Sequence, residues 1–308
     1  MRKIATLLAA ALVLSACGTG TTPPGGAPAA ETGQTRTVKH AMGETQVPAS
    51  PQRVIVLDTD KLDTMFSLGL TPVGAAQAAQ NTKMLSYLGS GFASVKPVGT
   101  LQELDLDAIR ALQPDLILGS KFRQEKFYDE LTSIAPTVFT EKVGITWKDN
   151  FLLDADALGK KSEAQALLDK YTQRAAGLKR TSQKVSLVRF MPDEIRVYGP
   201  ESFSGIVLKD AGVPRTARQE LADKSDKRFD KVSPERVQEV DGDVIFVSAY
   251  GEKAAQRQAE VTAGPLWTKL SAVAAGRSYV VDDEVWMLGI GVTAANKILD
   301  DLEKHLAA

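Results

Sequence analysis

The sequence predicts an α/β protein of two lobes with mainly parallel sheets, joined by a single long helix. From Arg53 onward, short apolar strand candidates alternate with helical stretches, a pattern typical of parallel α/β sheets. The same alternation starts again near residue 185. Between the two series, residues 161–182 carry apolar side chains at helical spacing without a proline, so we expect one continuous helix there.

The chain begins with a segment typical of export. Residues 1–3 are basic at two positions, residues 4–14 are apolar, and small residues precede Cys17. Because the apolar run is too short to span a bilayer, we expect residues 1–16 to be a signal peptide. The segment also resembles a bacterial lipobox, in which the cysteine becomes the lipidated first residue. Ordinary signal cleavage that leaves Cys17 unmodified is the alternative.

Domain boundaries follow from composition. Residues 17–36 are mostly Gly, Thr and Pro after the cysteine and carry no large apolar side chain, so they predict a lipidated, flexible tether. An N-terminal lobe is then expected over 37–160, the connecting helix over 161–182 and a C-terminal lobe over 183–308. We therefore expect an exported, monomeric body held at the cell membrane only through its lipid anchor.

The composition excludes several functions. With 308 residues and 44% hydrophobic side chains, the chain can bury a substantial core. Its net charge of −1 argues against nucleic-acid binding. A single Cys forbids an intrachain disulfide, and two His, at 40 and 305, leave little for a metal site or a catalytic triad. We expect no cofactor and no protein metal site, and free zinc or manganese capture is disfavoured.

Strand candidates can be placed in order along both lobes. In the first lobe they fall at 54–57, 72–73, 98, 116–118 and 137–139. In the second they fall at 185–190, 195–198, 244–247 and 279–281, followed by a last helix over about 293–306. Helical stretches fill the intervals, which predicts the same construction twice.

The two lobes share a short motif. Asp107 lies eight positions before Asp115, and Glu235 lies eight positions before Asp243; each later Asp opens an apolar strand. Asp107 and Glu235 both fall at the second position of an expected helix. The local interpretation is that an acid in the first turn stabilises the helix dipole by about 0.3–1 kcal/mol. The functional interpretation is that one exposed acid per lobe docks on basic residues of a partner.

Six segments along the chain form an ordered set: 51–57, 107–117, 121–138, 196–199, 241–247 and 286–289. Together they resemble the periplasmic-binding-protein family of iron–siderophore and cobalamin uptake, the substrate-binding lipoproteins of ABC importers. The resemblance implies a ligand cleft between the lobes, and one acid per lobe that pairs with arginines of the permease dimer. Asp107 and Glu235 match those positions, although the family more usually has Glu in the first lobe, which makes Glu103 a substitute candidate.

Residues 119–126 resemble binders of citrate-based or mixed citrate–hydroxamate ferric siderophores. The expected ligand is therefore an iron(III)–siderophore complex. Cobalamin or haem capture is the alternative within the family, with Tyr198 as the haem ligand to consider. A secreted hydrolase is a weaker alternative, because the sequence has no Gly-x-Ser-x-Gly, no His-Glu-x-x-His and no Gly-rich phosphate loop with a lysine.

A ferric siderophore brings its own iron ligands, so its binding site needs cations, hydroxyls and aromatic surface. Lys121 and Arg123 follow the strand at 116–118, and ligands bind at the carboxyl ends of parallel strands. Arg123 is also expected to begin a helix, where backbone N–H groups favour anions. A solvated basic turn is the alternative for both residues.

Further cleft candidates come from the second lobe. Arg189 ends one expected strand, and Arg196 and Tyr198 share one face of the next. Phe203 begins the following helix, and Trp286 follows the last strand. The alternatives are an ion pair of Arg196 with Asp193 or Glu194, and a core position for the tryptophan.

Overall fold

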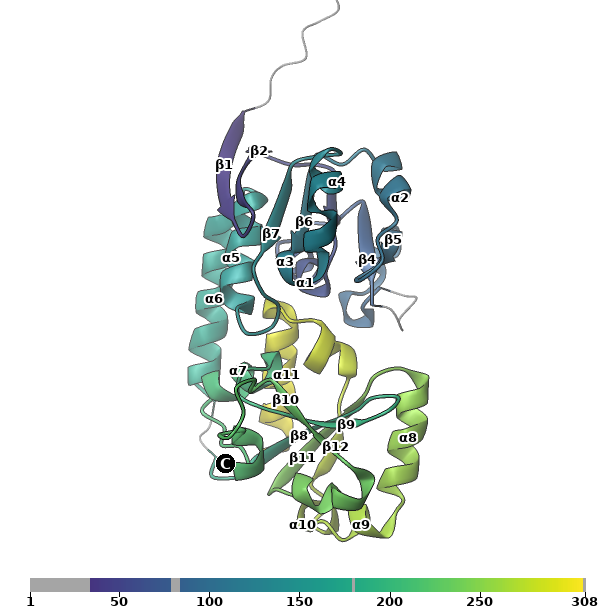
Figure 1. The fold of residues 1–308 in the computed structure, drawn as a ribbon. Coiled ribbons are helices and arrows are strands. Elements are labelled where there is room, and N and C mark those ends of the chain that lie inside the picture. The colour runs from purple at the N-terminus through teal and green to yellow at the C-terminus, as the bar shows by residue number, and fades with distance from the viewer. Residues whose placement is uncertain (1–33, 79–83, 179–180, 307–308) are drawn as a thin grey trace, which may run out of the picture. The chain divides into compact units, whose positions relative to one another are not determined.

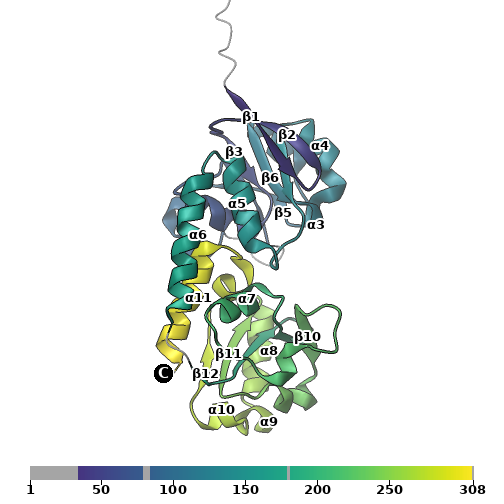
Figure 2. The ribbon, with the colours of Figure 1, turned by 90° about the vertical axis from the view of Figure 1, so that its left-hand side faces the viewer.

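The computed structural model describes residues 34–78, 84–178 and 181–306, shown as ribbons in Figures 1 and 2. The expected signal peptide, Cys17 and most of the expected tether lie outside this part of the chain. From Gln34 onward the chain forms one compact unit. Two five-stranded sheets with helices around them confirm the α/β class and the two lobes. Within the described ranges, no helix combines the length and apolarity needed to cross a bilayer.

The first sheet is entirely parallel and has the strand order β5-β4-β3-β6-β7. Its central strands β3 and β6 are buried along their whole length, which explains the apolar runs at 54–56 and 116–118. The strands are β3 Val54–Val56, β4 Gly74–Gln77, β5 Lys96–Thr100, β6 Leu116–Ser120 and β7 Thr137–Thr140. The helices are α1 Thr59–Ser67, η1 Ser86–Leu88, η2 Ser90–Phe92, α2 Leu106–Ala111, α3 Lys121–Gln124, η3 Glu125–Phe127, α4 Tyr128–Thr132 and α5 Trp147–Ala157.

An antiparallel hairpin that the sequence did not predict precedes this sheet. Its strands are β1 Thr35–His40 and β2 Gly43–Pro48. β1 therefore begins inside the expected tether. Only Val38 and Val47 of the two strands are buried, so the hairpin has too few apolar positions to stand out in the sequence.

The second sheet is mixed and has the order β10-β9-β8-β11-β12. β8, β11 and β12 are parallel, whereas β9 and β10 run antiparallel to their neighbours. Residues 191–194 join β8 to β9, a connection that suits a hairpin but is too short for a parallel crossover. The strands are β8 Val185–Phe190, β9 Ile195–Tyr198, β10 Phe229–Val232, β11 Val244–Ala249 and β12 Ser278–Val280. The helices are α7 Phe203–Asp210, η4 Ala217–Glu220, η5 Pro234–Val240, α8 Glu252–Thr262, α9 Pro265–Thr268, α10 Ser271–Ala274, η6 Glu284–Leu288 and α11 Val292–His305.

The long helix between the lobes is confirmed, and a second helix, α11, packs beside it. The connecting helix α6 spans Lys161–Ala176 and ends at Gly177, short of the expected residue 182, because glycine is a poor helix former. α11 lies beside α6 (Figure 2), and Arg174 of α6 donates to Asp300 of α11 over 2.6 Å. α11 also packs on α1 of the first lobe.

The repeated Asp of the shared motif has a structural role in both lobes. Asp115, which precedes β6, accepts hydrogen bonds from the backbone N–H of Gln52 (2.6 Å) and Arg53 (2.9 Å), just before β3. Asp243, which precedes β11, accepts one from Lys184 (2.7 Å), just before β8. Each carboxylate therefore sets the relative start of two neighbouring parallel strands.

Candidate functional site

Two adjoining cavities of about 180 and 300 Å³ are lined by residues of both lobes. The first lobe contributes α3 and the loop after β7, and the second contributes segments around β9, α7, β10 and η6. The first-lobe segments follow the carboxyl ends of parallel strands, where ligands bind in open α/β sheets. The smaller cavity is lined by Phe122, Arg123, Val143, Gly144, Tyr198, Glu201, Ser202, Phe203, Ser204, Arg228, Phe229, Trp286, Met287 and Ile290, and the larger by Phe122, Lys142, Val143, Ile145, Glu201, Ser225, Asp226 and Arg228.

Arg123 is the cation that α3 presents to the smaller cavity. Its Nε donates to Asp58 Oδ2 over 2.8 Å, and its side chain is 23% exposed. The charge of Asp58 raises the pKa of Arg123, so the guanidinium is a permanent cation. The neighbouring Phe122 is 58% exposed, and its ring centre lies 5.7 Å from the Arg123 guanidinium and 5.9 Å from that of Arg228. Both guanidiniums thus lie close to one exposed aromatic ring at the cavity wall.

Three predicted aromatic residues also line the smaller cavity. Tyr198 on β9 lies beside Phe229 on β10, with ring centres 5.9 Å apart. Phe203, at the start of α7, is held edge-on against Trp147 at 5.6 Å. Trp286 is fully buried, stacks on Phe246 and donates from Nε1 to Asp301 over 2.7 Å. Trp286 therefore forms the floor of the cavity as a core residue, not an exposed platform.

Three predicted cations lie outside the lining of both cavities. Lys121 is directed to Glu141, at 3.6 Å. Arg189 is 8% exposed and donates from Nε and Nη2 to the two oxygens of Asp283, over 2.7 and 2.5 Å. Its Nη1 also donates to the hydroxyl of Tyr198 over 3.3 Å, so Arg189 supports a cavity residue from behind.

Arg196 takes the ion-pair alternative. Its Nε bonds to Glu194, and its guanidinium covers the ring of Phe229 at 4.2 Å. Because Phe229 lines the cavity and Arg196 does not, the arginine stabilises the wall without facing a ligand.

Sequence reasoning missed several lining residues. Phe122 lies between the predicted residues Lys121 and Arg123 and lines the cavity. It was not predicted because only the cations of this stretch were considered. Arg228 and Phe229 were missed because β10 was not predicted: its sequence, Phe-Asp-Lys-Val, is short and half exposed. Arg228 is oriented by Asp226, with Nη2 and Oδ2 2.7 Å apart. Glu201 and Lys142 complete this group of missed residues.

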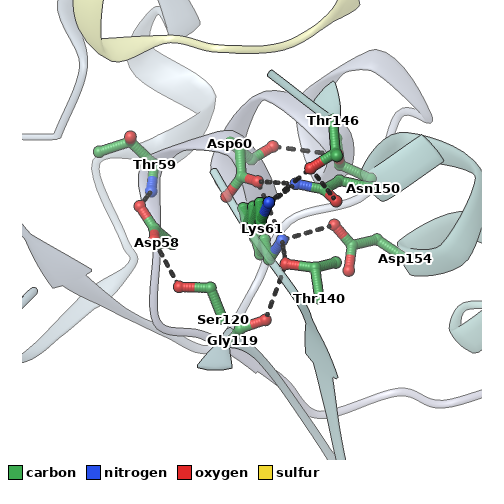
Figure 3. Close-up of polar contacts among 12 residues, drawn as sticks. Asp58, Thr59, Asp60, Lys61, Gly119, Ser120, Thr140, Thr146, Asn150 and Asp154 are labelled. Carbon is green, nitrogen blue, oxygen red and sulfur yellow. Dashed lines mark hydrogen bonds and ion pairs between the residues drawn. The ribbon is translucent and has the colours of Figure 1, made fainter. Parts of the chain in front are cut away.

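A cluster of buried charges surrounds Lys61 in the first lobe (Figure 3). The ammonium of Lys61 contacts Asp60 at 2.9 Å, Asp154 at 3.1 Å and the hydroxyl of Thr140 at 2.9 Å. Burial opposes the charge of Lys61, but Asp154 and Asp60 raise its pKa. Burial also raises the pKa of Asp60 and brings that of Asp154 to about 7. No group of three or more His, Cys, Asp or Glu suited to a metal ion occurs in the described parts of the chain.

The two predicted docking acids are exposed. Asp107 is the second residue of α2, its side chain is 95% exposed, and it accepts from Arg110 over 3.0 Å. The helix itself is capped by Asp105, which accepts from the backbone of Ala108. Glu235 is the second residue of η5 and is also exposed. Both carboxylates are accessible to a partner.

Comparison with known proteins shows similarity over almost the whole chain. A sequence model of the family described as periplasmic binding protein matches residues 54–285. The probable siderophore-binding lipoprotein YfiY of Bacillus subtilis is 38% identical, covering 97% of this chain and 95% of that protein. The Fe(3+)-citrate-binding protein YfmC of B. subtilis is 29% identical, covering 98% and 96%. The crystal structure of Staphylococcus aureus SirA complexed with staphyloferrin B has a TM-score of 0.76 at 32% identity, covering 88% and 98%.

Proposed function

Because this chain belongs to the periplasmic binding protein family, we propose that it captures a ferric siderophore and delivers it to the permease of an ABC importer. The observation that carries the proposal is the cavity between the lobes, where Arg123 and Arg228 both lie close to the exposed ring of Phe122. These groups suit a bulky, anionic, already chelated metal. The names of the relatives, which include siderophore and Fe(3+)-citrate binding, support a citrate-based or mixed citrate–hydroxamate ligand.

Within the cleft we assign ligand contact to Arg123, Tyr198 and Phe203, and add Phe122 and Arg228. Trp286 closes the floor. We assign Arg189 and Arg196 to the support of Tyr198 and Phe229. The role is binding and transfer of the intact complex, without chemical change to it.

We further propose that the protein is exported and anchored at the cell membrane through a lipid on Cys17. The basic start, the apolar run and the cysteine support this location, as do relatives named as lipoproteins. The anchored body is proposed to be monomeric and to meet the permease through Asp107 and Glu235.

Ligand binding is expected to change the fluorescence of Trp286, because its indole lies under the cavity. Titration of the purified protein with ferric dicitrate, ferric schizokinen and related complexes is expected to saturate at micromolar concentration or below. The iron-free ligands serve as controls, and equilibrium dialysis separates binding from optical absorption by the iron complex. Saturation by haem or cobalamin, with no response to any ferric siderophore, would show that the ligand class is wrong.

Charge reversal of both docking acids is expected to abolish uptake. The variant Asp107→Lys/Glu235→Lys replaces attraction to permease arginines with repulsion, while both sites lie outside the cavities, so ligand affinity stays unchanged. The measurement is uptake of radiolabelled iron complex by cells, beside a binding titration. The matched control is Glu130→Lys/Glu260→Lys, which reverses one exposed acid per lobe elsewhere. Normal uptake by the first variant contradicts the assignment.

A further inference from the structure

We propose that Asp58 is a positioning residue for ligand recognition, which holds Arg123 by Nε so that its two terminal nitrogens form a carboxylate-binding fork at the cavity. The inference rests on the proposed function and extends it to a residue that does not itself line either cavity. Asp58 lies between β3 and α1 and is completely buried. A buried carboxylate must be fully bonded, and the identity of its partners shows its role.

Each oxygen of Asp58 has a defined partner. Oδ1 accepts from the backbone N–H of Thr59 over 2.9 Å. Oδ2 accepts from the hydroxyl of Ser120 over 3.1 Å and from Arg123 Nε over 2.8 Å. The bonds to Thr59 and Ser120 hold the carboxylate from the protein side, so the arginine meets an acceptor that is already fixed.

The backbone that carries Arg123 is fixed separately. The adjacent Gln124 is completely buried, and its Oε1 accepts from the backbone N–H of Ser120 over 2.9 Å. Its Nε2 donates to the carbonyls of Leu57 (3.1 Å) and Leu101 (2.9 Å). α3 is thereby tied to the end of β3, and Arg123 is held at both its backbone and its Nε.

The terminal nitrogens of Arg123 are left for a ligand. Among the described residues, the hydrogen bond and ion pair recorded for this guanidinium both join Nε to Asp58 Oδ2, and none joins Nη1 or Nη2 to an acceptor. A guanidinium with two parallel N–H donors matches a planar carboxylate. Because the side chain is already ordered, a ligand carboxylate binds it with little loss of conformational entropy. The inferred ligands are ferric complexes that keep a carboxylate accessible at their surface.

A neighbouring buried acid, Asp154, provides a control that distinguishes the positioning role of Asp58 from a purely structural one. Lys61 contacts Asp60 and Asp154, whereas the ion pair of Asp58 is with Arg123. Neutralising Asp58 therefore removes the ion pair of Arg123, while neutralising Asp154 disturbs the same cluster and leaves that pair in place. Asp154→Asn is the matched control for burial and charge.

A double-mutant cycle tests the inference. The probe is the ferric complex that the wild type binds most tightly among ferric dicitrate, ferric schizokinen and the related complexes of the titration above. Asp58→Asn and Arg123→Gln are each expected to weaken binding about 10- to 100-fold, the range for a hydrogen bond to a charged group. Combined, they are expected to bind no more weakly than Arg123→Gln alone, because Asp58 acts only through the arginine. Asp154→Asn is expected to lower the melting temperature but to bind like the wild type.

The outcomes are distinct. If the wild type binds no ferric siderophore, the proposed function fails. If the wild type binds, and Asp58→Asn binds equally well or adds its full loss to that of Arg123→Gln, only the positioning role is overturned. If Asp58→Asn does not fold, Ser120→Ala replaces it, because it removes one bond to Oδ2 and keeps the carboxylate. A several-fold weakening of binding by Ser120→Ala that disappears in the Arg123→Gln background supports the positioning role. A weakening that persists in that background overturns it.

Discussion

Replacing Lys61 with methionine is expected to lower the free energy of unfolding by about 3–5 kcal/mol, the cost of removing one partner from a buried ion pair. Lys61 is completely buried, and its ammonium is the cation in contact with both Asp60 and Asp154. Methionine fills a similar volume but leaves both carboxylates without that partner. Urea unfolding followed by circular dichroism measures the change.

The loss is expected to depend on pH. Burial raises the pKa of Asp154 to about 7, above its ordinary value, so the folded state holds this proton more tightly than the unfolded state. The stability associated with Asp154 therefore falls as pH rises from about 4 through 7. Without Lys61, both carboxylates favour the protonated form more strongly. The difference in free energy of unfolding between the wild type and the variant is therefore expected to be largest near pH 8 and smaller near pH 5.

Lys148→Met provides the control. Its ammonium pairs with Asp210 at 2.7 Å, but the lysine side chain is 33% exposed. A partly exposed pair contributes about 1 kcal/mol or less. An equal loss of stability in the two lysine variants, or an effect of Lys61→Met that does not vary with pH, contradicts the account of the buried cluster.

Asp63→Ala is expected to lower the free energy of unfolding by about 2–4 kcal/mol, from the loss of several hydrogen bonds to one buried carboxylate. Asp63 belongs to α1 in the first lobe, yet its oxygens accept from the backbone N–H groups of Thr293 and Ala294, each over 2.9 Å, at the start of α11. Tyr87 also donates its hydroxyl over 2.7 Å. Alanine leaves these donors unpaired and releases the helix that ties the lobes.

Two further variants check this cross-lobe cap. Asp105→Ala removes the local cap of α2, which is exposed, and is expected to cost about 1 kcal/mol. Gly291→Ala is expected to reproduce the effect of Asp63→Ala, because a Cβ at Gly291 would lie 2.3 Å from Asp63 Oδ1. Thermal unfolding ranks the three variants. If Asp63→Ala lowers the melting temperature no more than Asp105→Ala does, the hydrogen bonds from α11 to Asp63 contribute less to stability than their geometry indicates.

The success of the sequence predictions depended on the range of the interactions involved. The strands at 116–118 and 244–247 were predicted because buried parallel strands are apolar without interruption. β10 and the β1–β2 hairpin were missed because their side chains are half exposed and carry no clear period. Arg189 and Arg196 were predicted to contact the ligand, but each pairs with an acid of the protein instead. The sequence could not show this for Arg189, because its partner Asp283 is distant along the chain.

Local hydrophobicity, periodicity and position after a strand were enough to predict the α/β class, the two lobes and the cavity cation Arg123. Tertiary contacts were needed to show which cations face the cavity, that Trp286 is a buried floor residue and that Asp58 pairs with Arg123. Asp58 and Arg123 are 65 positions apart, so no local sequence motif contains both residues. They meet only because β3 and β6 pair side by side. A charge is free or paired according to neighbours that the fold supplies, and those neighbours come from distant parts of the chain.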